Sequence, residues 1–321
     1  MKNTQLKSIT YTGLKSGLRL IVLGAVHGNE TCGTQAIEKI MQEFDSGQRT
    51  IIAGAVTFVP IANPLAYARK QRMGDRNLNR NLYPNLDPQD FEDHVTNWLC
   101  PLLAQHDVLL DLHSFHTPGQ AFALLGPNNN TGILEPFDLA TEEEALALRL
   151  GISVFVDGWL DTYSRGVAKR VANQAAYSDK SKPQNLDVKY GVGTTEYMRS
   201  QGGYGITLEC GQHDEALAPQ VAYGAICNTL AHLGLIAGNQ PEVVRNYESL
   251  RIIDVIDRLD IGDQFSQDWK SFDQLKAGDV IGIRENGEKL IAKYDVKILF
   301  PNPVALPGNE WYYLAKTIKR F

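Results

Sequence analysis

Long apolar runs that alternate with helical segments are the feature of this chain that most limits its fold. Residues 18–26 and 50–60 are nearly continuous aliphatic runs, and residues 31–44 between them place apolar side chains at helical spacing. Strands that are apolar on both faces, joined through a helix, favour a parallel sheet covered on both sides. The same reasoning predicts a helix over 91–103 and strands over 107–112 and 203–209.

The predicted secondary structure changes towards the carboxyl terminus. Beyond residue 238, short β-rich runs are divided by Gly, Asn and Asp turns. We therefore predict two domains, an α/β domain over 1–237 and a small β domain over 238–321. The predicted fold class is α/β, with a mixed, mainly parallel sheet flanked by helices and a small carboxy-terminal β domain.

Composition narrows the class of partner. The formal net charge of −6 disfavours a broad nucleic-acid surface, because phosphate binding needs clustered Lys and Arg. The apolar run near the amino terminus is too short to span a membrane, and the first residues lack the apolar core of a signal peptide. The four cysteines are scattered without CxxC spacing. We expect a cytoplasmic protein that binds a small molecule and not nucleic acid or a membrane, and a homo-oligomer is left open.

Chemically active side chains follow three of the predicted strands. His27, His113 and Glu209 each come where an aliphatic run stops, and Glu30 lies three residues after His27. Each alone has an ordinary explanation as a helix cap, a core histidine or a salt-bridge partner. In open α/β sheets, however, ligands bind at the carboxyl ends of the strands, so we expect these side chains to meet in one site.

Two histidines and a carboxylate are a ligand set for a catalytic zinc ion, which keeps a fourth position for water. Such a site still needs a base that is not itself a ligand, and Glu209 is the candidate. Asp111 lies on the same strand face as His113, where it can orient the imidazole, although it can equally be a strand-end turn residue. His116 and His213 are expected to line the pocket without binding metal.

A long loop with five basic residues lies between the second strand and the next helix. It reads "ANPLAYARKQRMGDRNLNRNLYP", and loops of this length in compact domains are usually functional. Arginine and asparagine side chains are suited to binding carboxylates. The loop therefore indicates a small anionic substrate, with structural salt bridges as the alternative role for any one of its arginines.

Taken together, "HGNE", "NLNR", "DLH" and "TLE" resemble the succinylglutamate desuccinylase/aspartoacylase family, which has the zinc carboxypeptidase-like fold. The resemblance spans residues 20–215 and implies one zinc ion per chain, held by His27, Glu30 and His113. It further implies the roles of five other residues: Glu209 as general base, Arg72 as the group that polarises the scissile carbonyl, Asn79 and Arg80 as the pair that binds the substrate carboxylate, and Arg199 as a further substrate-binding arginine.

The aspartoacylase branch of this family has a tyrosine where the chain has Thr195, with Tyr197 nearby, which argues against N-acetylaspartate as the substrate. Tyr312 and Tyr313 are candidates for a contribution of the β domain to the pocket. The predicted function is that of a zinc-dependent deacylase which hydrolyses the amide of an N-acyl amino acid or a related small carboxylate. The alternatives are a zinc carboxypeptidase acting on short peptides and a non-catalytic zinc- or anion-binding module on the same fold.

Overall fold

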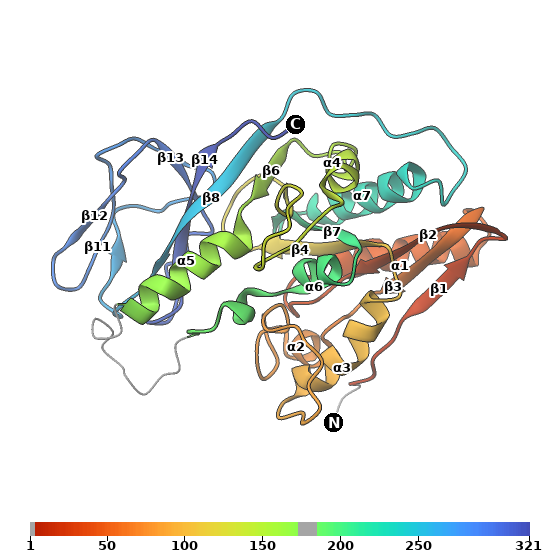
Figure 1. Cartoon of the computed structure of the whole chain (residues 1–321), viewed down its shortest axis with the longest axis horizontal. Coiled ribbons are helices and arrows are strands. Elements are labelled where there is room, and N and C mark those ends of the chain that lie inside the picture. The colour runs from red at the N-terminus through yellow and green to blue at the C-terminus, as the bar shows by residue number, and fades with distance from the viewer. Residues whose placement is uncertain (1–3, 173–184) are drawn as a thin grey trace.

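A mixed sheet of eleven strands extends through the computed structural model, which describes residues 4–172 and 185–321 (Figure 1). Its strand order is β1-β3-β2-β4-β7-β5-β6-β8-β14-β13-β10. The strands before residue 238 are β1 (Ile9–Thr12), β2 (Lys15–Leu23), β3 (Ala53–Val59), β4 (Val108–Phe115), β5 (Phe122–Leu124), β6 (Val154–Asp157) and β7 (Tyr204–Gln212). The neighbours β3, β2, β4 and β7 are parallel to one another, whereas β1 and β5 pair antiparallel with β3 and β7.

The strands beyond residue 238 continue this sheet. They are β8 (Glu248–Asp257), β10 (Gln274–Leu275), β13 (Val296–Leu299) and β14 (Glu310–Thr317). β8 pairs parallel with β6, and β14 and β13 follow in antiparallel order. A separate sheet of three strands consists of β9 (Gln264–Phe265), β11 (Val280–Ile283) and β12 (Lys289–Ile291). The predicted boundary falls in the connection between α7 and β8, and the division into two domains stays a prediction.

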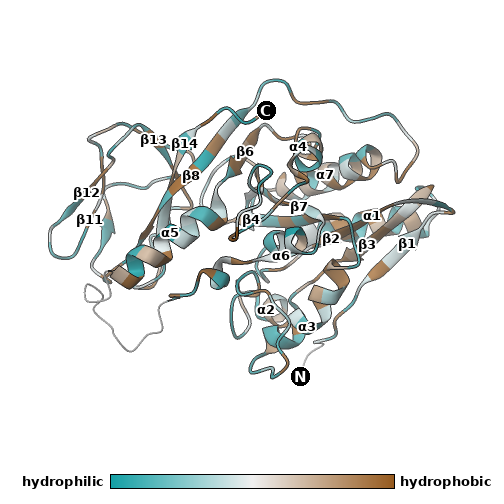
Figure 2. Ribbon diagram, viewed as in Figure 1, coloured by the Kyte–Doolittle hydropathy of each residue, from teal (hydrophilic) through white to brown (hydrophobic). Residues whose placement is uncertain are grey.

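Helices cover both faces of the sheet. They are α1 (Cys32–Asp45), α2 (Pro64–Arg69), α3 (Phe91–Leu103), α4 (Ala140–Ala147), α5 (Trp159–Ala172), α6 (Thr194–Ser200) and α7 (Ala218–His232), with a short 3₁₀ helix at Val188–Gly191. Buried side chains of α1, α4 and α7 share one apolar cluster with the sheet, and those of α3 and α6 share another. In Figure 2, α3 and α5 carry both hydrophobic and hydrophilic residues, as helices that cover a sheet should.

The alternation along the central strands decides which face carries polar groups. In β4, Val108, Leu110 and Leu112 pack into the cluster with α1 and α7, so Asp111 and His113 point to the opposite face. In β7, the alternation likewise places Thr207 and Glu209 opposite the apolar positions 206 and 208. The fold class predicted from the sequence is confirmed. Within the described residues no helix is long and apolar enough to cross a bilayer.

Candidate metal site and pocket

The HxxE segment forms the turn between β2 and α1. His27 lies four residues beyond the end of β2, and Glu30 lies two residues before α1, with its backbone N–H donating to the carbonyl of His27 at 3.1 Å. Gly28 packs against α2 so closely that a Cβ there would lie 2.0 Å from the backbone carbon of Ala66. Glycine is therefore required for this turn to pass α2 and present both side chains to the same place.

His113 and Glu209 are neighbours across two parallel strands. The sequence predicts that they follow their strands, but β4 and β7 continue past them, and His113 pairs in register with Glu209. Glu209 also pairs with Phe122 of β5, so its backbone is held on both sides. The ladder shifts register just after His113, between it and Phe115. Both strands continue because backbone pairing with a neighbouring strand, rather than the apolar run, determines where a strand ends.

Three donor groups meet at one buried point. His27 Nδ1 lies 2.9 Å from Glu30 Oε1, and His113 Nδ1 lies 2.8 Å from Glu30 Oε2. One ligand atom from each residue lies within 4.8 Å of the others, and each residue is at most 2 % exposed. Nitrogen, nitrogen and carboxylate oxygen in this arrangement match the ligands of an open zinc site.

The outer nitrogen of each imidazole is fixed by a polar partner. Nε2 of His113 donates to Asp111 Oδ2 at 2.9 Å, and Nε2 of His27 donates to Asn77 Oδ1 at 3.0 Å. Asp111 also accepts a hydrogen bond from the hydroxyl of Thr194. A proton held on Nε2 leaves Nδ1 as a lone pair directed into the site. Asp111 therefore has the orienting role considered from the sequence, and Asn77 has the matching role for His27.

Several buried atoms at this point lack a hydrogen-bond partner among the described residues. They include Nδ1 of His27, which is near Glu30 but not in hydrogen-bond geometry, Oε2 of Glu209 and Oδ1 of Asp111. Burial and the positive charge of Arg72 lower the pKa of His27 to about 4, so its imidazole is neutral and competent as a ligand. Burial and the negative charge of Glu30 raise the pKa of Glu209 to about 8. The residues present thus fit a divalent cation.

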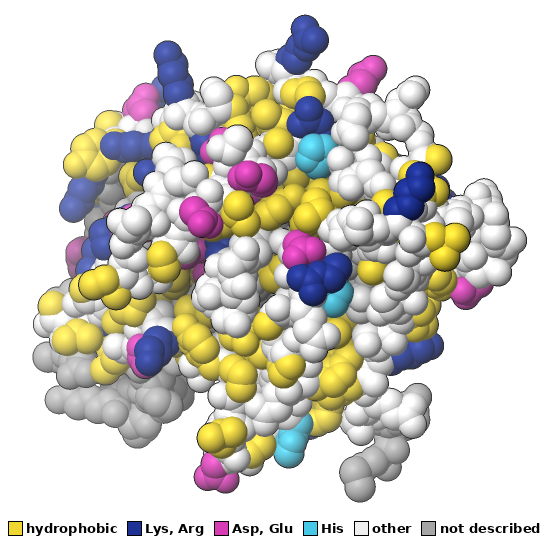
Figure 3. All heavy atoms as spheres, turned by 45° about the vertical axis from the view of Figure 1, so that its right-hand side comes forward, with side chains coloured by type: hydrophobic (Ala, Val, Ile, Leu, Met, Phe, Trp, Pro, Cys, Tyr) yellow, Lys and Arg dark blue, Asp and Glu magenta, His cyan; other side chains and the backbone are white. Residues whose placement is uncertain are grey.

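Arg72 links the donor group to a pocket. Its Nη1 donates to Glu30 Oε1 at 3.0 Å, while half of its side-chain surface stays exposed. It lines a cavity of about 410 Å³ together with His27, His113 and Glu209. Figure 3 shows, near the middle of one face, basic, acidic and histidine side chains meeting among hydrophobic ones.

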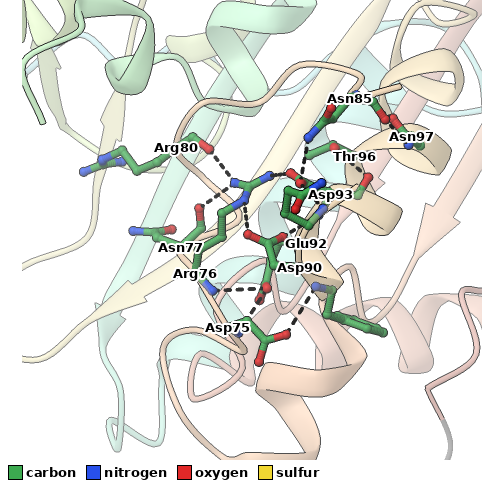
Figure 4. Close-up of polar contacts among 12 residues, drawn as sticks. Asp75, Arg76, Asn77, Arg80, Asn85, Asp90, Glu92, Asp93, Thr96 and Asn97 are labelled. Atoms are coloured by element: carbon green, nitrogen blue, oxygen red, sulfur yellow. Dashed lines mark hydrogen bonds and ion pairs between the residues drawn. The ribbon is translucent and has the colours of Figure 1, made fainter. Parts of the chain in front are cut away.

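The arginine loop is held by a buried carboxylate on α3. Glu92 is fully buried, and its Oε1 accepts from Gly74 N at 2.9 Å and from Asn63 Nδ2 at 2.8 Å. Its Oε2 accepts from the backbone N–H groups of Asp75, at 3.0 Å, and Arg76, at 3.2 Å. Four donors on one side chain fix the course of the loop against the helix. Figure 4 shows Glu92 beside two of the donor residues, Asp75 and Arg76.

Arg76 shapes the same loop from within. Its Nη1 donates to the carbonyls of Asn77, at 3.3 Å, and Arg80, at 2.9 Å, and its other nitrogens pair with Asp90 and Asp93 of the α3 amino-terminal turn (Figure 4). This arginine has a structural contact for every part of its guanidinium. Sequence reasoning missed Arg76 and Glu92 as determinants of the site, because their partners lie at irregular separations of 1 to 29 residues along the chain.

Asn79 and Arg80 both line the pocket. Asn79 Oδ1 accepts from the backbone N–H of Thr194 at 2.9 Å, which joins the loop to α6. The Arg80 guanidinium lies 4.6 Å from the ring centre of Trp159, and its Nη1 donates to the Asn79 carbonyl at 2.8 Å. In the described part of the chain, Arg80 Nε and Nη2 make no further hydrogen bond, so one edge of the guanidinium is available to a ligand.

Arg199 also borders the pocket but is held by acidic side chains. Its Nε donates to Glu143 Oε2 at 3.0 Å, and its Nη1 donates to Glu135 Oε1 at 2.9 Å. Its Nη2 donates to the carbonyl of Gly205 at 2.7 Å. The predicted role of Arg199 in binding substrate stays a prediction.

The carboxy-terminal region contributes one wall of the pocket. Tyr313 of β14 and the residues that precede this strand line it, whereas Tyr312 packs into the apolar cluster of the carboxy-terminal strands. Thr195 lines the pocket, while Tyr197 is buried against Tyr83.

The two further histidines lie beside the donor group. His116 lines the pocket and donates through Nε2 to the Pro301 carbonyl at 3.1 Å. The expectation that His213 lines the pocket is wrong for the described residues, because its ring contacts Ser114 and Asn29 instead. Neither is part of the three-residue group that could hold a metal.

Comparison with known proteins finds one matching family domain and several solved structures of similar fold. Residues 16–122 match the succinylglutamate desuccinylase/aspartoacylase catalytic domain. Among solved structures, the fold matches a succinylglutamate desuccinylase/aspartoacylase of Rhodobacter sphaeroides with 15 % identity and a TM-score of 0.71, covering 98 % of this chain and 90 % of that one. It also matches the product-bound ectoine utilization protein EutE of Ruegeria pomeroyi (16 % identity, TM-score 0.69, 96 % and 88 % covered).

A third structure with the same fold is the succinylglutamate desuccinylase of Vibrio cholerae, with 21 % identity, a TM-score of 0.67 and coverage of 97 % and 84 %. No curated protein sequence matches the chain. The resemblance inferred from the four motifs is confirmed, and it supports a hydrolase of the deacylase type.

Proposed function

We propose that this chain, whose residues 16–122 match the catalytic domain of the succinylglutamate desuccinylase/aspartoacylase family, is a zinc-dependent deacylase that hydrolyses the amide of an N-acyl amino acid. One observation carries the proposal. Among the described residues, Nδ1 of His27 and Oε2 of Glu209 are buried without a hydrogen-bond partner, and both side chains line a pocket into which Arg80 presents a guanidinium edge that makes no hydrogen bond.

His27, Glu30 and His113 would hold one zinc ion per chain. When bound there, zinc supplies a Lewis acid that lowers the pKa of water and polarises a carbonyl group. Asp111 and Asn77 keep the ligand nitrogens aimed at the ion, because each accepts the proton on the far side of an imidazole.

Glu209 is the proposed general base. It accepts a proton from water as the water oxygen attacks the acyl carbon, and it delivers that proton to the amine nitrogen when the carbon–nitrogen bond breaks. The products are a carboxylic acid and a free amino acid, so every atom of the water is accounted for. Arg72, half-exposed at the pocket, donates to the oxygen that gains negative charge.

Arg80 and Asn79 are the proposed carboxylate-binding pair. The Arg80 guanidinium is fixed by its contact with the Trp159 ring and by its hydrogen bond to the Asn79 carbonyl. Little conformational entropy is therefore lost when its free edge binds a carboxylate. The substrate is accordingly a small anion. A cytoplasmic location, a homo-oligomeric state and the lack of a nucleic-acid partner stay predictions.

The experiment is Glu209→Gln in the zinc-loaded enzyme. Glutamine keeps the size of the side chain but cannot accept the proton, so hydrolysis should fall roughly 10²–10⁴-fold while one zinc per chain remains. Glu43→Gln is the matched control, because Glu43 is a buried carboxylate on α1 that pairs with Arg49 away from the pocket. A zinc-loaded, folded Gln variant with wild-type turnover would overturn the mechanism, and a variant that loses zinc would make Glu209 a ligand.

A further inference from the structure

The charges around the pocket favour one substrate carboxylate over two. Among the described residues the pocket is lined by three cationic side chains of Arg or Lys type, and these are Arg72, Arg80 and Arg199. A dicarboxylate needs two of them to be available. The contacts of each guanidinium therefore decide which class of N-acyl amino acid the pocket can hold.

Arg199 is already neutralised. Besides Glu143 and Glu135, its Nη1 lies 3.6 Å from Glu196, so three carboxyl groups surround one buried guanidinium. Burial raises the pKa of Glu135 to about 7. Even with Glu135 protonated, the carboxylates of Glu143 and Glu196 remain beside Arg199. A substrate carboxylate at this point would therefore be repelled.

Arg72 is committed to the reacting end of the pocket, because it donates to Glu30 in the donor group. Arg80 is left to hold a carboxylate, and Glu310 lines the pocket close enough to interact electrostatically with it. Glu310 Oε1 lies 3.4 Å from Arg170, whose guanidinium is bonded through two nitrogens to Asp257. These two arginines and two carboxylates sum to zero charge, so a substrate carboxylate depends on direct contact with the free edge of Arg80, and a second carboxylate would face Glu310 or Glu196.

The remaining wall of the pocket is apolar and partly open to solvent. Val304 and Leu306, in the β13–β14 connection, are 79 % and 60 % exposed, and Met73 on the arginine loop is 48 % exposed. All three line the pocket, with Leu124 and Phe300 further apolar members. Exposed apolar side chains that surround a pocket lower the free energy of a bound apolar group, because both surfaces leave water.

A buried arginine holds this wall in place. Arg258 is 7 % exposed, and its hydrogen-bond acceptors among the described residues are all backbone carbonyls, which include Pro303 at 3.0 Å and Ala305 at 2.8 Å from Nη1. Through Nη2 it donates to the carbonyls of Ile261 and Asp263, at 2.6 and 3.1 Å. The guanidinium therefore ties the loop that carries Val304 and Leu306 to the segment after β8, and the wall is formed before a ligand arrives.

We propose, on the basis of the proposed function, that the substrate is an N-acyl amino acid with a single carboxylate and an apolar group, and not a dicarboxylate. The carboxylate binds at Arg80, and the apolar group lies against Val304 and Leu306.

The test uses substrates that differ in charge but not in shape. N-acetylleucine and N-acetylaspartate are isosteric in the side chain, and isocaproyl and succinyl amides are isosteric in the acyl group. With the zinc-loaded enzyme, kcat/KM should be at least about tenfold higher for the apolar member of at least one pair, as expected for a group that fills an apolar pocket. Higher kcat/KM for the dicarboxylate in both pairs would overturn the inference.

A variant of the wall gives an independent readout. Leu306→Asp should lower kcat/KM for the apolar substrate roughly tenfold and narrow its advantage over the dicarboxylate. Leu14→Asp is the control, because Leu14 is 105 % exposed in the β1–β2 turn and does not line the pocket. Since Leu306 is also largely exposed, both variants should fold, and circular dichroism checks this. An unchanged substrate preference in Leu306→Asp would remove the wall from the recognition of substrate.

Calorimetric binding of the same compounds separates this inference from the proposed function. If no compound is hydrolysed but the monocarboxylates bind more tightly than the dicarboxylates, the proposed reaction is wrong and the inferred preference for a single carboxylate stands. If the compounds are hydrolysed but dicarboxylates bind more tightly, the reaction stands and the inference is wrong.

Discussion

Glu92→Gln should separate the placement of the arginine loop from the chemistry of the site. Glu92 lies on α3 and accepts four hydrogen bonds, three of them from backbone N–H groups of the loop. The substitution replaces one carboxylate oxygen by an NH₂ group, which faces two donors instead of accepting from them. Among the described residues, neither the proposed metal ligands nor Glu209 makes a hydrogen bond to this side chain.

The expected magnitude follows from the contacts. A hydrogen bond to a charged group contributes about 1.5–3 kcal/mol, so the loss of two gives an upper limit of roughly 3–6 kcal/mol. Asp75 is exposed and Arg76 is half-buried, so water can replace part of this loss after the loop moves. We therefore expect the free energy of unfolding to fall by roughly 2–3 kcal/mol, and kcat/KM of the folded fraction to fall about tenfold to 10²-fold as Asn77 and Arg80 lose their positions.

The assay combines urea unfolding with steady-state kinetics on the zinc-loaded variant, and Glu43→Gln serves as the comparison. Glu43 accepts hydrogen bonds from Arg49 and Tyr223, so this control should lose stability without a matching loss of kcat/KM. If Glu92→Gln is destabilised but its folded fraction keeps wild-type kcat/KM, the loop does not depend on this carboxylate for its shape, and the reasoning fails.

Two further substitutions test the ligands and the carboxylate pair. Asp111→Asn should weaken zinc binding about 10–100-fold, because it removes the charged acceptor of the His113 Nε2 proton. Competition with a chelator measures the zinc affinity, and an unchanged affinity would contradict the orienting role of Asp111. Arg80→Ala should raise KM for carboxylate substrates by the equivalent of about 1.5–3 kcal/mol, with kcat much less affected. Arg19→Ala, which breaks an exposed pair with Asp107, is the control, and equal KM values for the two variants would exclude Arg80 from binding.

The sequence was sufficient to predict the donor group because local patterns encode it. An aliphatic run followed by HxxE specifies a strand, a turn and the start of a helix. Side chains two residues apart in a strand share a face, so Asp111 and His113 lie on the same face of β4. What the sequence could not supply was the register between β4 and β7. That register places His113 beside Glu209, and it depends on contacts between segments about ninety residues apart.

The roles of individual arginines were harder to predict for the same reason. Arg76 and Arg80 belong to one short segment. The guanidinium of Arg76 is bonded to the loop and to α3, whereas among the described residues one edge of the Arg80 guanidinium makes no hydrogen bond. Arg199 is surrounded by Glu135 and Glu143, which lie 64 and 56 residues away in sequence. Residue type gives the capacity to bind a carboxylate, but the distant carboxylates of the chain itself decide whether that capacity remains.

The donor group and the pocket walls are held in place by different contacts, which implies that metal binding and substrate specificity can change separately. The donor group depends on β4, β7 and the turn after β2, which are fixed by backbone pairing inside the sheet. The pocket walls depend on Glu92 and Arg258, buried charged side chains whose partners are mostly backbone groups of irregular loops. Backbone partners do not depend on the identity of the loop side chains. Val304, Leu306 or Met73 can therefore be exchanged while the wall keeps its course and the donor group stays intact, so the β13–β14 connection is where substrate preference can diverge on a constant hydrolytic centre.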